Sequence, residues 1–365
     1  MPIRVLLVDD SVVTRQVLAK VLGESDDLTI CEQAANGRQA LQKLDAAAPD
    51  VVVLDVEMPV MNGLETLREI RRRDPHLPVV MFSALTRPGV QTTIDALLAG
   101  ASDYVAKPDG RSDTPQVIRE TLAAKIRLHH RAARRPTGTR RELRQPQRSR
   151  PPVEAGEITL RPEPRVPPPV RAIVIGVSTG GPQALLRLFE ALPSDLGVPI
   201  LIVQHMLPTF LSHLAFRLSS RTPIVVKMAE DGRLAADSPA WLAPGRRHLK
   251  VVRAAAGPTL RTSDDPPVMS CRPAADVLFR SAAAVFGPGT LGVVMTGMGR
   301  DGLAGSEAIV AAGGQVLVQD EDSSVVWGMP KVVAWAGLAT TVGTPEQLAE
   351  KIVSRVRHPT GTGDR

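Results

Sequence analysis

The sequence predicts an α/β protein with two domains, each formed around a mainly parallel β-sheet. Short apolar segments rich in β-branched residues alternate with helical patterns in both halves of the chain, as in doubly wound folds. A stretch rich in arginine and proline separates the halves, and 365 residues suffice for two separate hydrophobic cores. Aromatic residues make up only 3% of the chain, so we expect cores of aliphatic residues and methionine, which suit strands buried on both faces.

Residues 1–130 are expected to form a doubly wound sheet of five parallel strands. The strand candidates are, in order, RVLLVDD, TICEQAA, DVVVLDVEMP, LPVVMFSAL and DYVAKP. Helical patterns separate these strands, among them residues 12–22, 37–46 and 63–73. The last helix is predicted over residues 114–130, where Ile118, Leu122 and Ile126 recur at four-residue spacing on one face.

Residues 131–169 are predicted to be a flexible basic linker. Residues 131–150 contain eight arginines and one acidic residue, which more than accounts for the net charge of +6. The linker ends in PEPRVPPPV, where the fixed φ and missing N–H of proline favour extended, unpaired backbone. Because residues 131–150 hold almost no apolar side chains, they cannot form a core. Since the excess positive charge lies in this linker and not in a folded domain, we expect no nucleic-acid partner.

Residues 170–358 are expected to form the second α/β domain, followed by a disordered tail over residues 359–365. Its main strand candidates are AIVIGV, PILIVQH, LGVVMTG and GQVLVQD. Residues 224–252, IVVKMAEDGRLAADSPAWLAPGRRHLKVV, are predicted to be an insertion of short antiparallel strands.

The cysteines and the apolar segments indicate a cytoplasmic protein. Cys31 and Cys271 are far apart and match no metal-binding or redox spacing, so we expect two buried thiols in a reducing compartment. No segment approaches the roughly 18 apolar residues of a membrane span. The apolar run at the N-terminus meets two aspartates at once, which argues against a signal peptide.

Polar side chains gather where the strands of the first domain end. Asp9 and Asp10 follow the first predicted strand, Asp55 ends the third, and Ser83 and Lys107 end the fourth and fifth. The carboxyl ends of parallel strands share one edge of the sheet, so the three carboxylates should converge there. They would repel one another unless a cation lay between them, and a hard divalent ion such as Mg²⁺ suits this oxygen cluster.

This constellation closely resembles the receiver domain of two-component response regulators. The matching motifs are VDDS at 8–11, LDVEMPVMNG at 54–63, SAL at 83–85 and KP at 107–108. The resemblance implies that Asp55 accepts a phosphoryl group from a histidine kinase. It also implies that Asp9, Asp10, Asp55 and the Glu57 main-chain carbonyl hold Mg²⁺. Ser83 and Lys107 would contact the phosphoryl oxygens and report the change.

The second domain opens with the segment GVSTGGP, residues 176–182. A phosphate-binding loop would need a lysine after the glycines or a G-x-G-x-x-G pattern, and the segment has neither. It does match G-x-S-x-G, which places a serine on a sharp turn from strand to helix, here Ser178. Pro182 suits the first turn of the following helix, where its missing N–H costs nothing.

Two further polar residues are predicted at the same sheet edge as Ser178. His205 lies at the end of PILIVQH, and Asp301 lies in the glycine-rich loop beyond LGVVMTG. Three strands would thus supply a Ser-His-Asp system, with His205 as base and Asp301 fixing its tautomer. The N–H groups near Thr179 or Met298 could receive the oxyanion. The competing bases are His213 and His248, and the competing acids are Asp276, Asp320 and Asp322.

Residues 170–357 resemble the catalytic domain of the chemotaxis protein-glutamate methylesterases. The motifs are IGVSTGGP at 175–182, QHM at 204–206, LAPG at 242–245, MTGMGRDG at 295–302 and WGMP at 327–330. Ser178, His205 and Asp301 match the nucleophile, base and orienting acid of that family. Leu207 stands where the family commonly has proline, and the linker is longer and more basic than usual.

The resemblance implies an esterase that demethylates glutamates on chemoreceptors at receptor arrays and deamidates selected glutamines, with no cofactor in the catalytic domain. A tethered receiver has a high effective concentration near the catalytic edge, so phosphorylation of Asp55 is expected to weaken a docked state and expose Ser178. Two other outputs are a non-enzymatic binding module and a DNA-binding domain. No helix-turn-helix pattern or basic recognition helix supports the latter outside the linker.

Overall fold

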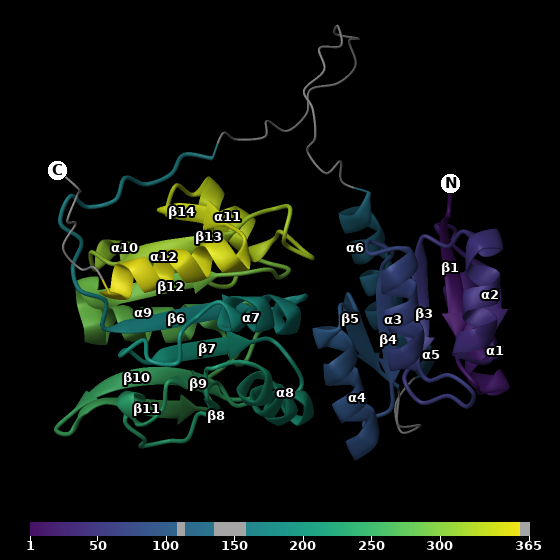
Figure 1. Ribbon diagram of the computed structural model, residues 1–365, viewed down its shortest axis with the longest axis horizontal. Helices are drawn as coiled ribbons and strands as arrows, with labels where there is room; N and C mark the ends of the chain where they lie inside the picture. Colours follow the sequence, from purple (N-terminus) through teal and green to yellow (C-terminus); the bar gives the residue numbers. More distant parts are fainter. Residues whose placement is uncertain (108–113, 135–157, 358–365) are drawn as a thin grey trace, which may run out of the picture. The chain divides into compact units, whose positions relative to one another are not determined.

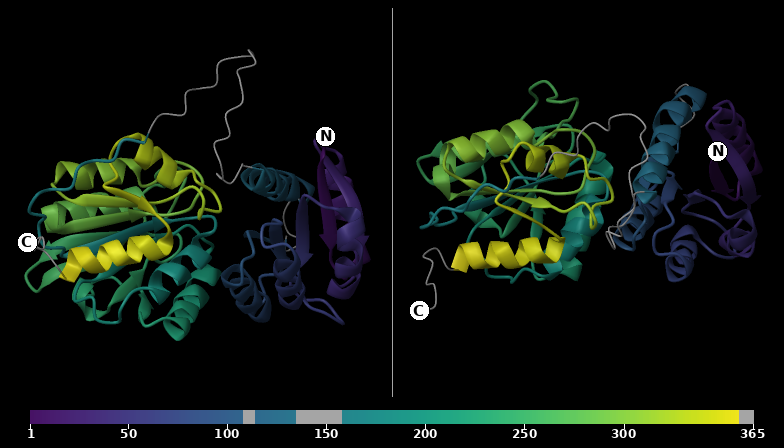
Figure 2. Two further views of the ribbon diagram at one scale, coloured as in Figure 1. Left: turned by 45° about the horizontal axis from the view of Figure 1, so that its top comes forward. Right: turned by 90° about the horizontal axis from the view of Figure 1, so that it is seen from above.

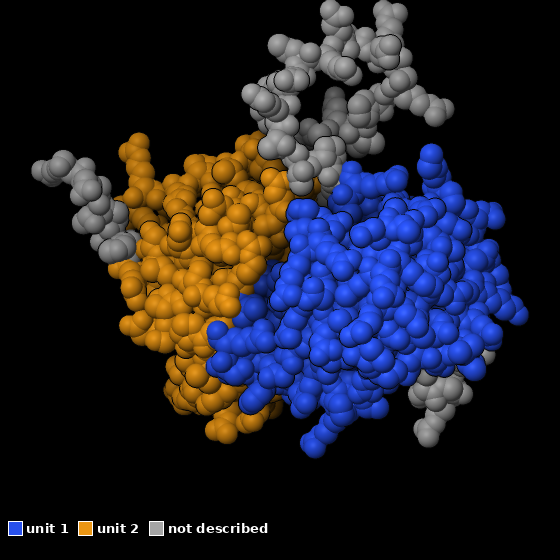
Figure 3. All heavy atoms as spheres, turned by 45° about the vertical axis from the view of Figure 1, so that its right-hand side comes forward, with its two compact units in different colours: residues 1–134, 179–186, 206–221 blue, residues 135–178, 187–205, 222–365 orange. Residues whose placement is uncertain are grey.

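The computed structural model describes residues 1–107, 114–134 and 158–357. Figures 1 and 2 trace the chain, and Figure 3 colours its two compact units. One unit comprises residues 1–134, 179–186 and 206–221, and the other comprises residues 135–178, 187–205 and 222–365. The predicted tail 359–365 and much of the predicted linker, residues 135–157, lie outside the described residues.

The N-terminal 134 residues contain a five-stranded parallel sheet in the order β2-β1-β3-β4-β5, which confirms the predicted doubly wound fold. The strands are β1 (Ile3–Val8), β2 (Leu28–Ala34), β3 (Val51–Asp55), β4 (Val79–Ser83) and β5 (Asp103–Ala106). The helices are α1 (Val12–Gly23), α2 (Gly37–Ala47), α3 (Gly63–Arg73), α4 (Arg87–Leu98), α5 (Thr114–Val117), η1 (Ile118–Leu122) and α6 (Ala123–Ala133).

The helix predicted over residues 114–130 extends to Ala133 and contains one π-helical turn, Ile118–Leu122. The prediction that Ile118, Leu122 and Ile126 form its apolar face is confirmed, since all three are buried. They join α1 and the strands β1, β3 and β4 in one hydrophobic core, which fixes that face of the sheet.

The second sheet has seven strands, all parallel, in the order β14-β13-β12-β6-β7-β9-β8. Its strands are β6 (Ala172–Val177), β7 (Ile200–Gln204), β8 (Val226–Met228), β9 (Ala240–Leu242), β12 (Thr290–Val294), β13 (Gln315–Gln319) and β14 (Thr341–Gly343). The remaining strands, β10 (His248–Ala254) and β11 (Gly257–Ser263), form a separate antiparallel hairpin. The mainly parallel second sheet is therefore confirmed.

The helices of this half of the chain lie between its strands in the sequence, except α12, which follows the last strand. They are α7 (Gly181–Glu190), α8 (Pro208–Arg221), η2 (Ala235–Asp237), α9 (Ala275–Phe286), η3 (Gly287–Gly289), α10 (Leu303–Ala311), α11 (Met329–Trp335) and α12 (Pro345–Arg357). α9 contacts both the β10–β11 hairpin and β6, so that one hydrophobic core joins the hairpin to the sheet.

The prediction of antiparallel strands over residues 224–252 is wrong for the first two strands of that segment. β8 and β9 pair in parallel and extend the main sheet beyond β7. Each has only three residues, and the η2 turn and loops between them allow the chain to return to the same end of the sheet. Only β10 is antiparallel, and it pairs with β11.

Part of the predicted linker is ordered against the second sheet's own helices and loops. The Arg161 N–H donates to the Ala339 carbonyl at 2.8 Å, and Glu163 forms an ion pair with Lys351 at 2.5 Å. Arg355 donates to the Pro168 carbonyl at 3.2 Å. Residues 161–168 therefore belong structurally with α12 rather than with a free tether.

Candidate active site

The predicted serine, histidine and aspartate lie beyond the carboxyl ends of three neighbouring strands. β6 pairs with β7 on one side and with β12 on the other, so strand order reverses around β6. Ser178 directly follows β6, His205 directly follows β7, and Asp301 lies in the loop between β12 and α10. Ligands of open parallel sheets bind at such a reversal point, which is where the predicted catalytic residues meet.

The backbone around Ser178 is fixed by its neighbours. The Ser178 N–H donates to the Thr296 carbonyl at 2.9 Å, and the Gln204 side chain donates to the Ser178 carbonyl at 2.8 Å. Gly297 packs so closely that a Cβ there would lie 2.6 Å from the Ser178 Cβ and 2.6 Å from the Met329 sulfur. Only glycine fits at residue 297 without moving the serine.

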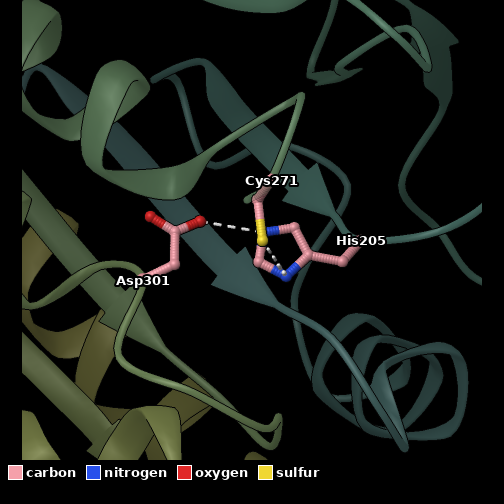
Figure 4. Close-up of side chains that lie close together, drawn as sticks. All are labelled: His205, Cys271 and Asp301. Atoms are coloured by element: carbon pink, nitrogen blue, oxygen red, sulfur yellow. Dashed lines mark hydrogen bonds and ion pairs between the residues drawn. The ribbon is translucent and has the colours of Figure 1, made fainter. Parts of the chain in front are cut away.

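His205 is held by the predicted acid. Its Nε2 lies 2.8 Å from Asp301 Oδ2, and the ring is largely buried. Since Asp301 occupies Nε2, the nitrogen left to act as a base is Nδ1. The Cys271 sulfur lies 3.8 Å from this Nδ1 (Figure 4). Within the described residues, no hydrogen bond joins the Ser178 hydroxyl to the ring, an arrangement common before substrate binds.

Asp301 is positioned by the first turns of two helices. It accepts hydrogen bonds from the N–H groups of Ala275 at 2.6 Å, Asp276 at 2.9 Å and Gly302 at 3.0 Å. Asp276 in turn accepts from Gly302 at 3.0 Å and from Gly305 at 2.7 Å. The two carboxylates thus cap each other's helices, α9 and α10, where the helix dipoles favour negative charge.

The electrostatics of the His205–Asp301 pair favour a charged imidazolium. Burial is the largest single effect and would lower the pKa of His205, but the hydrogen bonds and charges of Asp301 and Cys271 together outweigh it and raise that pKa to about 9. Burial would raise the pKa of Asp301, but the hydrogen bonds from His205 and the backbone hold it below its usual range. The carboxylate therefore stays ionised and stabilises the ring once it has taken a proton.

The competing bases and acids have other environments. His248 is fully buried, with Nε2 3.1 Å from the Pro266 carbonyl and Nδ1 accepting from the Ala274 N–H, so both ring nitrogens are occupied. His213 lies in the middle of α8. Asp276 is used in capping, and Asp320 accepts from Ser323. Asp322 is exposed.

Two residues of the candidate site were not identified from the sequence: Cys271 beside His205, and Gly297 beside Ser178. The prediction of two buried thiols is wrong, because Cys31 and Cys271 are each partly exposed. Nothing local marks Cys271, which is sixty-six positions from His205 in the chain. Gly297 could have been found from the glycine-rich loop MTGMGRDG.

Of the two residues predicted to supply oxyanion donors, Thr179 is half-buried and Met298 is 60% exposed.

The first sheet gathers the predicted acidic cluster at its carboxyl edge. Lys107 Nζ lies 2.9 Å from Asp9 Oδ2 and 2.8 Å from Asp55 Oδ2. Burial raises the pKa of Asp55 to about 6 against the opposing effect of Lys107. Ser83 is buried at the end of β4, where its hydroxyl accepts from Thr93 at 2.8 Å.

The acidic cluster fits a hard divalent cation. One oxygen from each of Asp9, Asp10 and Asp55 lies within 4.8 Å of the others. Asp9 Oδ2 is buried and has an ion pair with Lys107 but no well-directed hydrogen bond. Asp10 and Glu57 line an open pocket beside these atoms, so a bound ion could complete its shell with the Glu57 carbonyl and water.

Comparisons with known proteins agree with both halves of the chain. The response regulator receiver domain family matches residues 5–119, and the CheB methylesterase family matches residues 173–352. A protein-glutamate methylesterase/protein-glutamine glutaminase of Trichodesmium erythraeum is 44% identical, with 97% of this chain and 99% of that protein covered. One from Nocardioides is also 44% identical, with 97% and 95% covered.

Among solved structures, the catalytic domain of the CheB methylesterase of Thermotoga maritima is 35% identical. The match covers 51% of this chain and 98% of that chain, with a TM-score of 0.49. No helix in the described part of the chain is long and apolar enough to cross a bilayer. The agreement with relatives over nearly the full length makes the chain a member of the protein-glutamate methylesterase/protein-glutamine glutaminase family, with a receiver domain preceding its methylesterase domain.

Proposed function

We propose that this enzyme demethylates glutamate side chains on chemoreceptors and deamidates selected receptor glutamines, giving chemotactic adaptation. We also propose that phosphorylation of Asp55 raises its activity, and that it acts in the cytoplasm at receptor arrays. The observation that carries the catalytic part is the placement of Ser178, His205 and Asp301 at one strand-order reversal, with Asp301 bonded to His205 at 2.8 Å.

In the proposed mechanism, the Ser178 hydroxyl attacks the side-chain carbonyl of the substrate. His205 takes the hydroxyl proton on Nδ1, because Asp301 occupies Nε2. It then gives this proton to the leaving methoxide or amide, which departs as methanol or ammonia. Water, deprotonated by His205, hydrolyses the acyl-enzyme and restores Ser178. This reaction needs no cofactor in the catalytic domain.

The developing oxyanion would be bound by main-chain N–H groups. Thr179 follows Ser178 in the turn after β6, and Met298 follows Gly297, which packs directly on Ser178. The Thr179 N–H is therefore close to Ser178 along the chain, and the Met298 N–H is close to Ser178 through the packing of Gly297. Main-chain donors fixed in this way stabilise the tetrahedral intermediate without reorganising during the reaction.

In the receiver domain, Asp55 would accept the phosphoryl group of a histidine kinase. Asp9, Asp10, Asp55 and the Glu57 carbonyl would hold Mg²⁺, whose charge offsets that of the phosphoryl oxygens. Lys107 already lies 2.8 Å from Asp55 and would bind a phosphoryl oxygen instead. Ser83, whose hydroxyl also faces Thr93, would move toward the phosphoryl group.

The test is methanol release from methylated receptor membranes by the full-length protein, with and without acetyl phosphate. We expect release that rises with acetyl phosphate, loses that response in Asp55→Asn, and disappears in Ser178→Ala. Release that persists in Ser178→Ala would exclude Ser178 as the nucleophile. Unchanged release while Asp55 is shown to be phosphorylated would exclude the regulatory part.

A further inference from the structure

A cysteine lies against the pair formed by the candidate base and acid. Figure 4 shows the Cys271 sulfur over the His205 ring, next to the ring's hydrogen bond with Asp301. One ligand atom from each of these three residues lies within 4.8 Å of the other two. The mechanism proposed above gives Cys271 no part.

A tight turn fixes the main chain of Cys271. Val268 and Cys271 exchange two hydrogen bonds, of 3.0 Å and 2.8 Å, across a two-residue turn. The turn residues Met269 and Ser270 have φ values of 50° and 62°, the left-handed region required by a tight hairpin turn of this kind. The main chain of Cys271, from which the sulfur projects, is therefore fixed by a closed turn.

The three side chains together offer nitrogen, sulfur and oxygen ligands, the set that Zn²⁺ prefers. Zinc bonds of about 2.0 to 2.3 Å place tetrahedral ligand atoms about 3.5 Å apart. Nε2 lies 2.8 Å from Oδ2, whereas the sulfur contacts the other ring nitrogen, Nδ1, at 3.8 Å. Binding of an ion at Nε2 therefore requires the Cys271 side chain to turn toward Nε2 and the Nε2–Oδ2 hydrogen bond to open. The acidic cluster of the receiver, made only of oxygen ligands, suits harder ions.

Asp301 also has the supporting contacts of a metal ligand. Its carboxylate accepts three backbone hydrogen bonds, from Ala275, Asp276 and Gly302, which would fix its orientation toward an ion. Cys271 is partly exposed and the His205 side chain is 15% exposed, so an ion can reach the ligands from solvent. A fourth position would remain open to water.

We propose that Zn²⁺ or a similar borderline-soft divalent ion binds His205 Nε2, Cys271 Sγ and Asp301 Oδ2 and inhibits the enzyme. Binding releases the thiol proton and the Nε2 proton of the imidazolium to water, and Nδ1 keeps its proton. Nδ1 then cannot accept the Ser178 proton, so the esterase loses its base. The inhibitory effect rests on the proposed function, whereas binding of the ion does not.

The experiment uses the full-length protein with excess Mg²⁺ and no phosphodonor, and measures two quantities. Co²⁺ is titrated while the near-ultraviolet band of thiolate-to-cobalt charge transfer is recorded. Zn²⁺ is titrated against basal methanol release. The variants are Cys271→Ser and Cys271→Ala, with Cys31→Ser as the matched thiol control and Ser178→Ala as a protein without the nucleophile.

We expect the band in the wild type, in Cys31→Ser and in Ser178→Ala, and its loss in both Cys271 variants. Zinc inhibition should weaken by more than about tenfold in the Cys271 variants. Absence of the band in the wild type, or its persistence in a folded Cys271 variant, would overturn the metal site. Equal inhibition in wild type and Cys271 variants would also overturn it. Methanol release by Ser178→Ala would instead count against the proposed catalytic function.

Discussion

The raised pKa of His205 predicts an alkaline pH–rate profile that depends on Asp301. The shift from 6.5 to about 9 corresponds to about 3 kcal/mol in favour of the imidazolium. Only the neutral ring can act as base, so about 1% of the enzyme is competent at pH 7, and kcat/KM should rise tenfold per pH unit until about pH 9. Asp301→Asn removes the carboxylate charge, which should move the midpoint toward 6.5 and lower the plateau.

The assay is kcat/KM for methanol release from methylated receptor membranes between about pH 6 and about pH 10. Asp276→Asn is the matched control, because this neighbouring carboxylate bonds to Gly302 and Gly305 and not to His205. Its midpoint should stay close to that of the wild type. A wild-type midpoint near 6.5, or an unchanged midpoint in Asp301→Asn, would refute the argument that Asp301 controls the base.

Four other predictions follow from described contacts. The raised pKa of His205 contributes folding stability that is fully present below about pH 6.5 and is lost as pH rises through about 9. Thermal unfolding should therefore show a fall in Tm over this pH range, and the fall should be smaller in Asp301→Asn. Gly297→Ala should cost about 1–3 kcal/mol in denaturant unfolding and lower kcat, since its Cβ would meet Ser178; unchanged kcat would contradict the packing argument. His248→Ala should reduce stability by about 2–4 kcal/mol because it leaves the Ala274 N–H without its acceptor, whereas His213→Ala should keep both stability and activity. Chelation of Mg²⁺ should abolish labelling by radioactive acetyl phosphate but leave basal methanol release intact; labelling that survives would exclude a metal-dependent acceptor site.

Where the pattern is local, the sequence predicts the structure well. The helix predicted over 63–73 has those same bounds, because Asn62 and Glu65 form a capping box that marks its start. The order of strand ends also placed Ser178, His205 and Asp301 at one edge, since parallel strands present their carboxyl ends together. Both inferences depend on features within a few residues of the element concerned.

The sequence does not predict features that depend on contacts with distant parts of the chain. β8 and β9 have three residues each, too few to show a period, and their direction depends on the free edge of β7. Cys271 reaches His205 through a turn whose residues, Met269 and Ser270, are not usual for a left-handed backbone. The assignment of Nδ1 as the ring nitrogen not bonded to Asp301 depends on the direction from which Asp301 approaches the ring.

The exchange of caps between Asp276 and Asp301 makes the active site sensitive to events in the two helices. If the first turn of either α9 or α10 opens, Asp301 loses backbone donors that hold it toward His205. Partial unfolding of these helices would therefore inactivate the enzyme before the sheet is disrupted. Loss of activity during mild denaturation would then report the opening of this helix pair, and substitutions in the α9–α10 interface would alter catalysis without touching a reacting group.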